Sequence, residues 1–258
     1  SADPTFTANT ITTSADGAWE VFGADMDNDG DIDLLSASHA DNKIIFYKNN
    51  GADDPAFTTS NISTQAYSTR AVYAADIDSD GDMDVLAGTG STDDEVVWYK
   101  NNGNANPTFA GILIYNSDDS RSVFAIDLDS DGDIDVINAS DGDNAIYWGE
   151  NNGSESFTKR TLASNVSDPM SLYAADVDND GDIDVIAGTQ GDNKVIWYES
   201  NGAADPSFTA NTITTSANGI YSVYAKDMDN DGDIDILSAS FADDKIAWYE
   251  NNGAADPT

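Results

Sequence analysis

Asp25-Met-Asp-Asn-Asp-Gly-Asp-Ile-Asp33 is the first of five nine-residue stretches that have Asp at positions 1, 3, 5, 7 and 9 and Gly at position 6. The other four begin at Asp76, Asp127, Asp176 and Asp227, at spacings of 51, 51, 49 and 51 residues. A fixed period of this length indicates a repeat architecture in which each repeat is one structural unit.

Each repeat contains four short segments rich in β-branched and aromatic residues, separated by turns of Gly, Asn and Asp. The first segment precedes the Asp loop, the second follows it, the third is aromatic, and the fourth begins with Phe (Phe6, Phe57, Phe109, Phe157 and Phe208). Four strands in a repeat of about 50 residues are typical of a propeller blade. The sequence therefore predicts an all-β fold, a five-bladed β-propeller of four-stranded antiparallel blades, with residues 1–258 as a single domain.

The two ends of the chain suggest how such a ring closes. Residues 6–15 are identical to residues 208–217, which form the fourth segment of the fourth repeat, while the last repeat has three segments. We expect the N-terminal strand to complete the last blade and close the ring, which would hide two exposed sheet edges. The competing interpretation is a window cut from a longer array of repeats.

The Asp loops have the chemistry of a calcium site. Calcium takes six to eight oxygen ligands in flexible geometry, and Gly at position 6 permits a sharp turn. We assign side-chain ligation to positions 1, 3, 5 and 9 and a backbone carbonyl to position 7, whose side chain is expected to face solvent. The predicted metal residues are Asp25, Asp27, Asp29, Asp31 and Asp33; Asp76, Asp78, Asp80, Asp82 and Asp84; Asp127, Asp129, Asp131, Asp133 and Asp135; Asp176, Asp178, Asp180, Asp182 and Asp184; and Asp227, Asp229, Asp231, Asp233 and Asp235. One Ca²⁺ per repeat, five in all, is the expectation.

These loops are not EF-hands, because position 12 carries no Glu in any copy. The repeat instead resembles the FG-GAP/VCBS family, which includes the calcium-binding blades of the integrin α-subunit propeller. The Phe-Gly signature is kept at Phe22-Gly23, but no Gly-Ala-Pro follows. The resemblance implies a propeller with a mostly structural calcium ion in the loop between the first and second strands of each blade.

Composition limits the function. The formal net charge is −38, from 48 acidic and 10 basic residues, which excludes nucleic acid as a partner and argues against anionic lipid. No apolar run approaches the length of a membrane span, so no membrane insertion is expected. The chain has no Cys, which excludes disulfides and thiol chemistry. Calcium can stabilise a secreted domain in their place, and we expect an extracellular, secreted or cell-surface location.

Nothing in the sequence points to catalysis, and we expect no enzyme activity. The only histidine, His39, lies in a polar turn and is expected to be a surface residue. A calcium-stabilised extracellular binding or adhesion module is the favoured function, with a glycan or an extracellular protein as ligand. A structural spacer of a large adhesin or exoprotein is the alternative, and an accessory domain of a polysaccharide-degrading enzyme is a third interpretation. Four repeated tryptophans are predicted to be inter-blade core: Trp98, Trp148, Trp197 and Trp248.

Two repeat positions vary in chemical kind. Six residues before each loop stand Trp19, Arg70, Arg121, Met170 and Tyr221, and in the turn after the second segment stand His39, Gly90, Asp141, Gln190 and Phe241. In an up-and-down blade both positions lie at the end opposite the Asp loops. Aromatic residues and Arg are enriched at binding hot spots. We therefore predict a ligand-binding face opposite the calcium loops, formed by Trp19, Arg70, Arg121, Met170, Tyr221, His39, Gln190 and Phe241.

Overall fold

A computed structural model describes residues 7–254, and within these residues the chain forms nineteen strands and no helix. The first two sheets contain β1 (Ala18–Ala24), β2 (Asp33–Ser38), β3 (Lys43–Asn49), β4 (Phe57–Ser63), β5 (Ala71–Ala75), β6 (Asp84–Gly88), β7 (Glu95–Asn101) and β8 (Phe109–Asn116). The next two contain β9 (Ser120–Ile126), β10 (Asp135–Ser140), β11 (Ala145–Asn151), β12 (Phe157–Ser164), β13 (Pro169–Ala175), β14 (Asp184–Thr189), β15 (Lys194–Ser200) and β16 (Phe208–Thr214). The last contains β17 (Ile220–Lys226), β18 (Asp235–Ser240) and β19 (Lys245–Tyr249).

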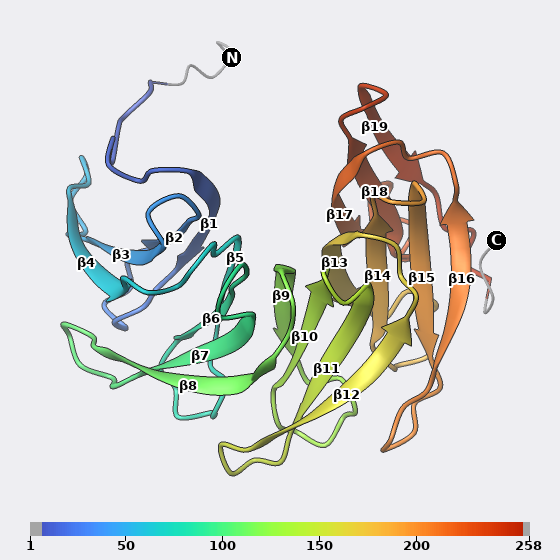
Figure 1. The fold of residues 1–258 in the computed structure, drawn as a ribbon, viewed down its shortest axis with the longest axis horizontal. Helices are drawn as coiled ribbons and strands as arrows, with labels where there is room; N and C mark the ends of the chain where they lie inside the picture. Colours follow the sequence, from blue (N-terminus) through green and yellow to red (C-terminus); the bar gives the residue numbers. More distant parts are fainter. Residues whose placement is uncertain (1–6, 255–258) are drawn as a thin grey trace.

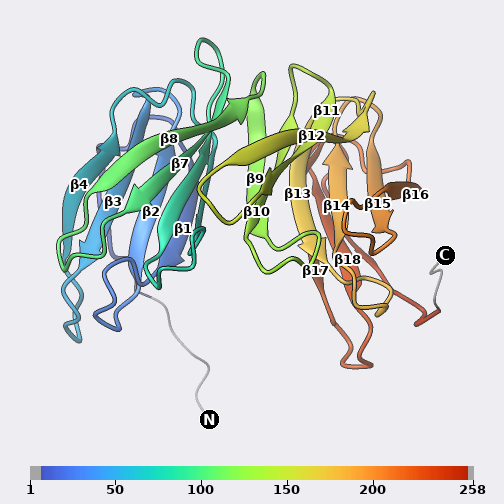
Figure 2. The same cartoon turned by 90° about the horizontal axis from the view of Figure 1, so that it is seen from below.

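The sheets are the five blades of a β-propeller, as predicted. Strands are paired antiparallel in the order of the sequence, and four sheets have four strands each. The strand that precedes each Asp loop is the innermost, and consecutive inner strands contact one another from β1 to β17. Small residues on these strands, such as Gly23 and Ala74, let the blades crowd toward the axis. Figure 1 shows the blades following one another around an arc, and Figure 2 shows the same sheets from below.

Each of the four junctions between consecutive blades contains its own hydrophobic cluster. Trp98, Trp148 and Trp197 are at most 2% exposed, which confirms their prediction as inter-blade core. In each case the indole lies on the face of its blade that contacts the following blade. Trp248, at the same place in the fifth blade, is 48% exposed, because no blade follows it within the described residues.

The ring is open between the fifth blade and the first. β19 pairs only with β18 in the described part of the chain, and Thr7–Thr13 form no strand, so the prediction that the N-terminal strand closes the ring is wrong for these residues. Phe6 of that predicted strand lies outside the described residues. The ring does not close because the five blades do not bring β19 back beside β1. The two strands lie on opposite sides of the opening in Figure 1. Val21 on β1 is 68% exposed, whereas its counterpart Val72 is 1% exposed.

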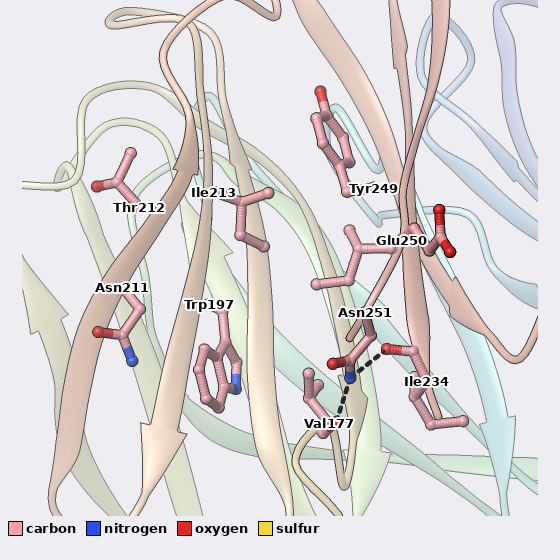
Figure 3. A pocket seen from close by; sticks show the side chains of 10 residues that line it. Val177, Trp197, Asn211, Thr212, Ile213, Ile234, Tyr249, Glu250 and Asn251 are labelled. Carbon is pink, nitrogen blue, oxygen red and sulfur yellow. Dashed lines mark hydrogen bonds between the residues drawn. The ribbon is translucent and has the colours of Figure 1, made fainter. Parts of the chain in front are cut away.

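A cavity lies beside the fifth blade, which has three strands in residues 7–254. In earlier blades the Phe that begins the fourth strand packs on the aromatic core residue of the preceding blade: Phe109 lies 6.0 Å from Phe46 and Phe157 lies 6.2 Å from Trp98, between ring centroids. Trp197 lacks such a partner among the described residues. It lines a pocket of about 270 Å³ together with Val177, Ile213, Tyr249 and others (Figure 3).

Candidate functional site: the aspartate loops and the axial pocket

The Asp loops connect the innermost strand of each blade to its neighbour, as the resemblance implies. Two residues in each loop have left-handed backbone: position 4 (φ 58° at Asn28) and the Gly at position 6 (φ 92° at Gly30). The carboxylate of Asp25 at position 1 accepts hydrogen bonds from the amides of Asp29 (3.1 Å) and Gly30 (2.9 Å). These bonds curl the loop around the position-1 carboxylate and bring alternate side chains together.

Each loop gathers three carboxylates whose nearest oxygen atoms all lie within 4.8 Å of one another. The groups are Asp25, Asp27 and Asp29; Asp76, Asp78 and Asp84; Asp127, Asp129 and Asp135; Asp176, Asp178 and Asp180; and Asp227, Asp229 and Asp235. One carboxylate oxygen of Asp27 and one of Asp78 are buried without a hydrogen-bond partner. In all five loops the close carboxylates form an all-oxygen donor set, which fits a hard divalent cation such as Ca²⁺.

The Asp at position 9 has a structural role that sequence reasoning missed. One Asp33 oxygen accepts from the amide of Met26 (3.1 Å) and the other from the amide of Asn49 (2.7 Å). The same pair of bonds recurs in all five blades. Position 9 was predicted to be a ligand in every loop, and it belongs to the close carboxylate group at Asp84, Asp135 and Asp235. In every blade it also ties the loop to the third strand.

Burial makes these position-9 carboxylates costly to ionise. Desolvation raises the pKa of Asp84 to about 6 and that of Asp135 to about 7, although backbone hydrogen bonds oppose the shift. Both side chains are fully buried. A nearby cation would favour the charged form of such a group.

The Asp at position 7 turns its side chain away from the carboxylate group, toward the turn after the third strand. A Cβ at Gly51 would lie 2.0 Å from an Asp31 oxygen, and the same overlap recurs at the equivalent glycines beside Asp82, Asp133, Asp182 and Asp233. Asn28 also donates to Asp82 of the next blade at 2.7 Å. The position-7 residues are half-buried, so the side chain that was expected to face solvent also packs on the turn. A side chain at position 51 would collide with Asp31, which explains the glycine there.

At the opposite end of the inner strands lies an axial pocket of about 320 Å³. We define the axial pocket by its lining: Trp19, Glu20, Arg70, Arg121, Ser122, Met170, Ser171, Tyr221 and Ser222. The five residues that stand six positions before the loops, all predicted to bind a ligand, line the axial pocket. They come from all five blades, because the pocket is formed where the inner strands, or the turns that lead into them, converge on the axis.

A network of charges spans the rim of the axial pocket. Arg121 lies 2.9 Å from Asp119 and 2.5 Å from Asp141, and Arg70 pairs with the other oxygen of Asp119. These arginine side chains are 13% and 17% exposed, for Arg70 and Arg121 respectively, so their charges are partly shielded from water. The guanidinium planes are held in place by these bonds.

Trp19 lies at the edge of this network and is 46% exposed. The Arg70 guanidinium lies 5.5 Å from the centre of the indole, and the His39 ring lies 5.8 Å from it. His39 is half-buried with a nitrogen 3.1 Å from Arg70, so it has a fixed partner that sequence reasoning did not foresee. Burial lowers the pKa of His39, and the positive charges of Arg70 and Arg121 lower it further.

The remaining predicted residues are distributed unevenly. Met170 lines the axial pocket but is buried. Phe241 is 59% exposed and meets Tyr221 edge to face, with 5.1 Å between ring centroids. Gln190 lies in the equivalent turn of the fourth blade and is not among the lining residues. Asp119 was missed, and its signal was Asp118-Asp119, the only pair of consecutive acidic residues at this turn among the five repeats.

The family model of the FG-GAP-like repeat matches residues 25–87, 127–187 and 176–238, which together span more than half of the chain. The chain belongs to the FG-GAP repeat family. No curated protein matches this FG-GAP propeller.

Solved structures share its fold at low sequence identity. An Agrocybe aegerita lectin that recognises non-reducing terminal N-acetylglucosamine is 18% identical with a TM-score of 0.63, and the match covers 93% of this chain and 64% of the lectin. A functionally unknown protein from Desulfotomaculum acetoxidans is 10% identical with a TM-score of 0.61, covering 95% and 74%. The Vibrio cholerae biofilm matrix protein Bap1 is 18% identical with a TM-score of 0.52, covering 91% and 37%. The FG-GAP propeller thus spans less than two thirds of the lectin and little more than a third of Bap1.

No helix in residues 7–254 is long and apolar enough to cross a bilayer.

Proposed function

We propose that this FG-GAP propeller is a non-catalytic extracellular binding module, stabilised by calcium at the Asp loops, that binds a glycan in the axial pocket. The observation that carries the proposal is the exposed indole of Trp19 beside the ordered charges of Arg70, Arg121, Asp119 and Asp141. This is the place where near-identical repeats differ most in chemistry.

The chemistry of the axial pocket suits a sugar. A sugar ring presents an apolar C–H face, which an aromatic side chain can cover, and hydroxyl groups that both donate and accept hydrogen bonds. Trp19 and Tyr221, both 46% exposed, offer aromatic surface on different sides of the pocket. The arginines donate and the aspartates accept, and their ion pairs fix the geometry before a ligand arrives.

The same contacts support binding rather than catalysis. Asp119 and Asp141 are engaged by Arg121, so neither is a free general base or nucleophile. His39 has Arg70 as its polar partner and no carboxylate that would orient it as a base. A binding site needs only such fixed donors and acceptors.

The Asp loops support the calcium and the location in this proposal. Each loop concentrates carboxylates that repel one another unless a cation lies among them. Calcium outside cells is abundant enough to fill sites of moderate affinity, as in other extracellular modules. The loops are therefore the structural face and the axial pocket is the binding face. Likeness to a lectin and to a biofilm matrix protein agrees with this assignment at the level of the fold.

The test is a glycan array probed with the chain in millimolar calcium, followed by titration of the best glycan against three variants. Trp19→Ala and Arg121→Ala should each weaken binding at least tenfold, because they remove the aromatic surface and the donor of the pocket. Trp248→Ala is the matched control: its indole is 48% exposed but lies on the open face of the fifth blade. Binding to no glycan by the folded chain, or equal loss in the control, would overturn the proposal.

A further inference from the structure

One position beside the Asp loops divides the five blades into two chemical classes. It lies at the end of the third strand, next to the Asn or Ser whose amide bonds the position-9 Asp. The first two blades have a lysine there, Lys48 and Lys100, and the other three have a glutamate: Glu150, Glu199 and Glu250. The formal charge beside the loop therefore differs by two units between the classes.

The lysines enter the carboxylate groups of their own blades. The Lys48 ammonium pairs with Asp27, whose side chain is fully buried, and lies 3.7 Å from Asp29. Lys100 pairs with the equivalent Asp78 and with Glu155 at 2.5 Å. Both lysine side chains are about three quarters buried, at 27% and 28% exposed for Lys48 and Lys100. An ammonium in this position acts as the counter-ion of the position-3 carboxylate and neutralises its charge.

The glutamates do the opposite. Within residues 7–254, no lysine or arginine forms an ion pair with an aspartate of the third, fourth or fifth loop. Glu150 pairs instead with Arg160 at 2.7 Å, and Glu199 accepts a hydrogen bond from the side-chain amide of Asn211 at 3.0 Å. In the described part of the chain, these three loops therefore lack the ion-paired lysine that the first two loops have.

We propose that Lys48 and Lys100 replace calcium as the counter-ion of the first two loops, so that strong calcium binding is confined to the third, fourth and fifth blades. The inference rests on the proposed calcium role of the loops. A lysine at the cluster repels an incoming cation and occupies an oxygen that the cation would use, whereas a glutamate there attracts the cation and adds a possible oxygen ligand. Affinity of calcium sites varies with the charge of the ligand set.

Calcium titration of the chelator-treated chain by calorimetry tests whether the loops divide into strong and weak calcium sites. We expect three tight sites and two sites weaker by about tenfold or more. Hydrogen exchange in the same samples should show calcium-dependent protection in residues 127–135, 176–184 and 227–235 at calcium levels that leave residues 25–33 and 76–84 unchanged.

Charge reversal supplies the decisive variants. The double variant Lys48→Glu with Lys100→Glu should convert the two weak sites into tight ones. Lys43→Glu is the matched control, because Lys43 pairs with Asp41 in the turn at the far end of the third strand. Five sites of equal calcium affinity in the parent chain, or unchanged affinities in the folded double variant, would overturn this inference but not the proposed calcium role. Absence of calcium binding at every loop would instead overturn the proposed calcium role.

Discussion

The side-chain amide of Asn101 leaves its own blade and donates a 2.8 Å hydrogen bond to the main-chain carbonyl of Met26 in the Asp loop of the preceding blade. The same amide also donates to the carbonyl of Met83 at 2.9 Å in its own loop. One side chain thus holds two consecutive loops in register. Asn251 repeats the contact with Val177 at 2.8 Å, while the fourth blade has Ser200 at this position.

Removing this amide should loosen the junction between the first two blades. We expect Asn101→Ala to lower the free energy of unfolding by about 1–3 kcal/mol, because it leaves buried carbonyls without a donor. Denaturant unfolding in saturating calcium measures the change. Asn49→Ala is the control, since the side-chain amide of Asn49 donates to Ile32 of its own blade at 3.0 Å and, among the described residues, to no carbonyl of another blade. Equal losses in the two variants would show that the inter-blade bond adds nothing to stability.

The open ring predicts unequal effects for two equivalent tryptophans. Trp197→Ala should lower the free energy of unfolding by about 3–5 kcal/mol because it removes a buried indole from a blade junction. Trp248→Ala should cost less than about 1 kcal/mol, since half of its side chain already faces solvent. Thermal melts of both variants in the same buffer provide the comparison. Similar large losses would mean that the fifth blade is covered in solution.

Chelation should destabilise the propeller. Cations that bind only the folded state add RT ln(1 + [Ca]/Kd) per site, and several sites together reach the total stability of a domain. We expect the melting temperature to rise steeply with millimolar calcium and to fall with chelator. Magnesium should substitute poorly, because it requires a tighter octahedron.

Ionic strength must be held constant in this experiment, since salt alone screens the repulsion within a chain of net charge −38. Sodium chloride matched to the calcium buffer is the control. A melting temperature that does not change on thorough chelation would contradict the structural role of the metal.

Glu20, which lines the axial pocket, makes the stability of the folded chain depend on pH. Desolvation by the surrounding strands raises the pKa of Glu20 from an ordinary 4.5 to about 7, although its side chain keeps contact with solvent in the pocket. The folded state therefore binds this proton more tightly than the unfolded state does. The stability that protonation of Glu20 contributes to the folded state is fully present below about pH 4.5 and is lost as the pH rises through 7.

Glu20→Gln should consequently be more stable than the parent at pH 8 and no more stable at pH 4. The glutamine carbonyl can still accept the 2.7 Å hydrogen bond from the amide of Val72. The gain should stay below about 1 kcal/mol because solvent screens an exposed carboxylate. The difference in melting temperature between the two chains at each pH is the measurement, and any calcium effect common to both cancels. A variant less stable than the parent at pH 8 would contradict the raised pKa.

Much of the fold could be predicted from local patterns. The β-branched segments and the turn residues recur with a fixed period, so one blade predicts the others. The small residues before each loop, such as Gly23 and Ala74, indicated the inner strand correctly. The convergence of Trp19, Arg70, Arg121 and other variable positions on one pocket also followed from topology, because all precede the inner strand by the same number of residues.

Other features depend on distances that no local pattern encodes. The identity of residues 6–15 and 208–217 suggested a closing strand, yet whether Thr7–Thr13 can pair with β19 depends on the rotation accumulated over five blades. The structure places these residues outside every sheet. The hydrogen-bond partner of His39 comes from the second blade, and only the folded chain brings Arg70 beside it.

The sequence by itself determined the blade, its strand order and the gathering of carboxylates in each loop, because these arise from alternation, turns and glycine within about 50 residues. The tertiary structure decided which loop aspartates meet a lysine, since Lys48 of the third strand pairs with Asp27. It also decided that Trp248 is exposed where Trp197 is buried. The physical reason is that burial and ion pairing are set by what the neighbouring blade supplies, and identical local sequences receive different neighbours at the ends of an open ring.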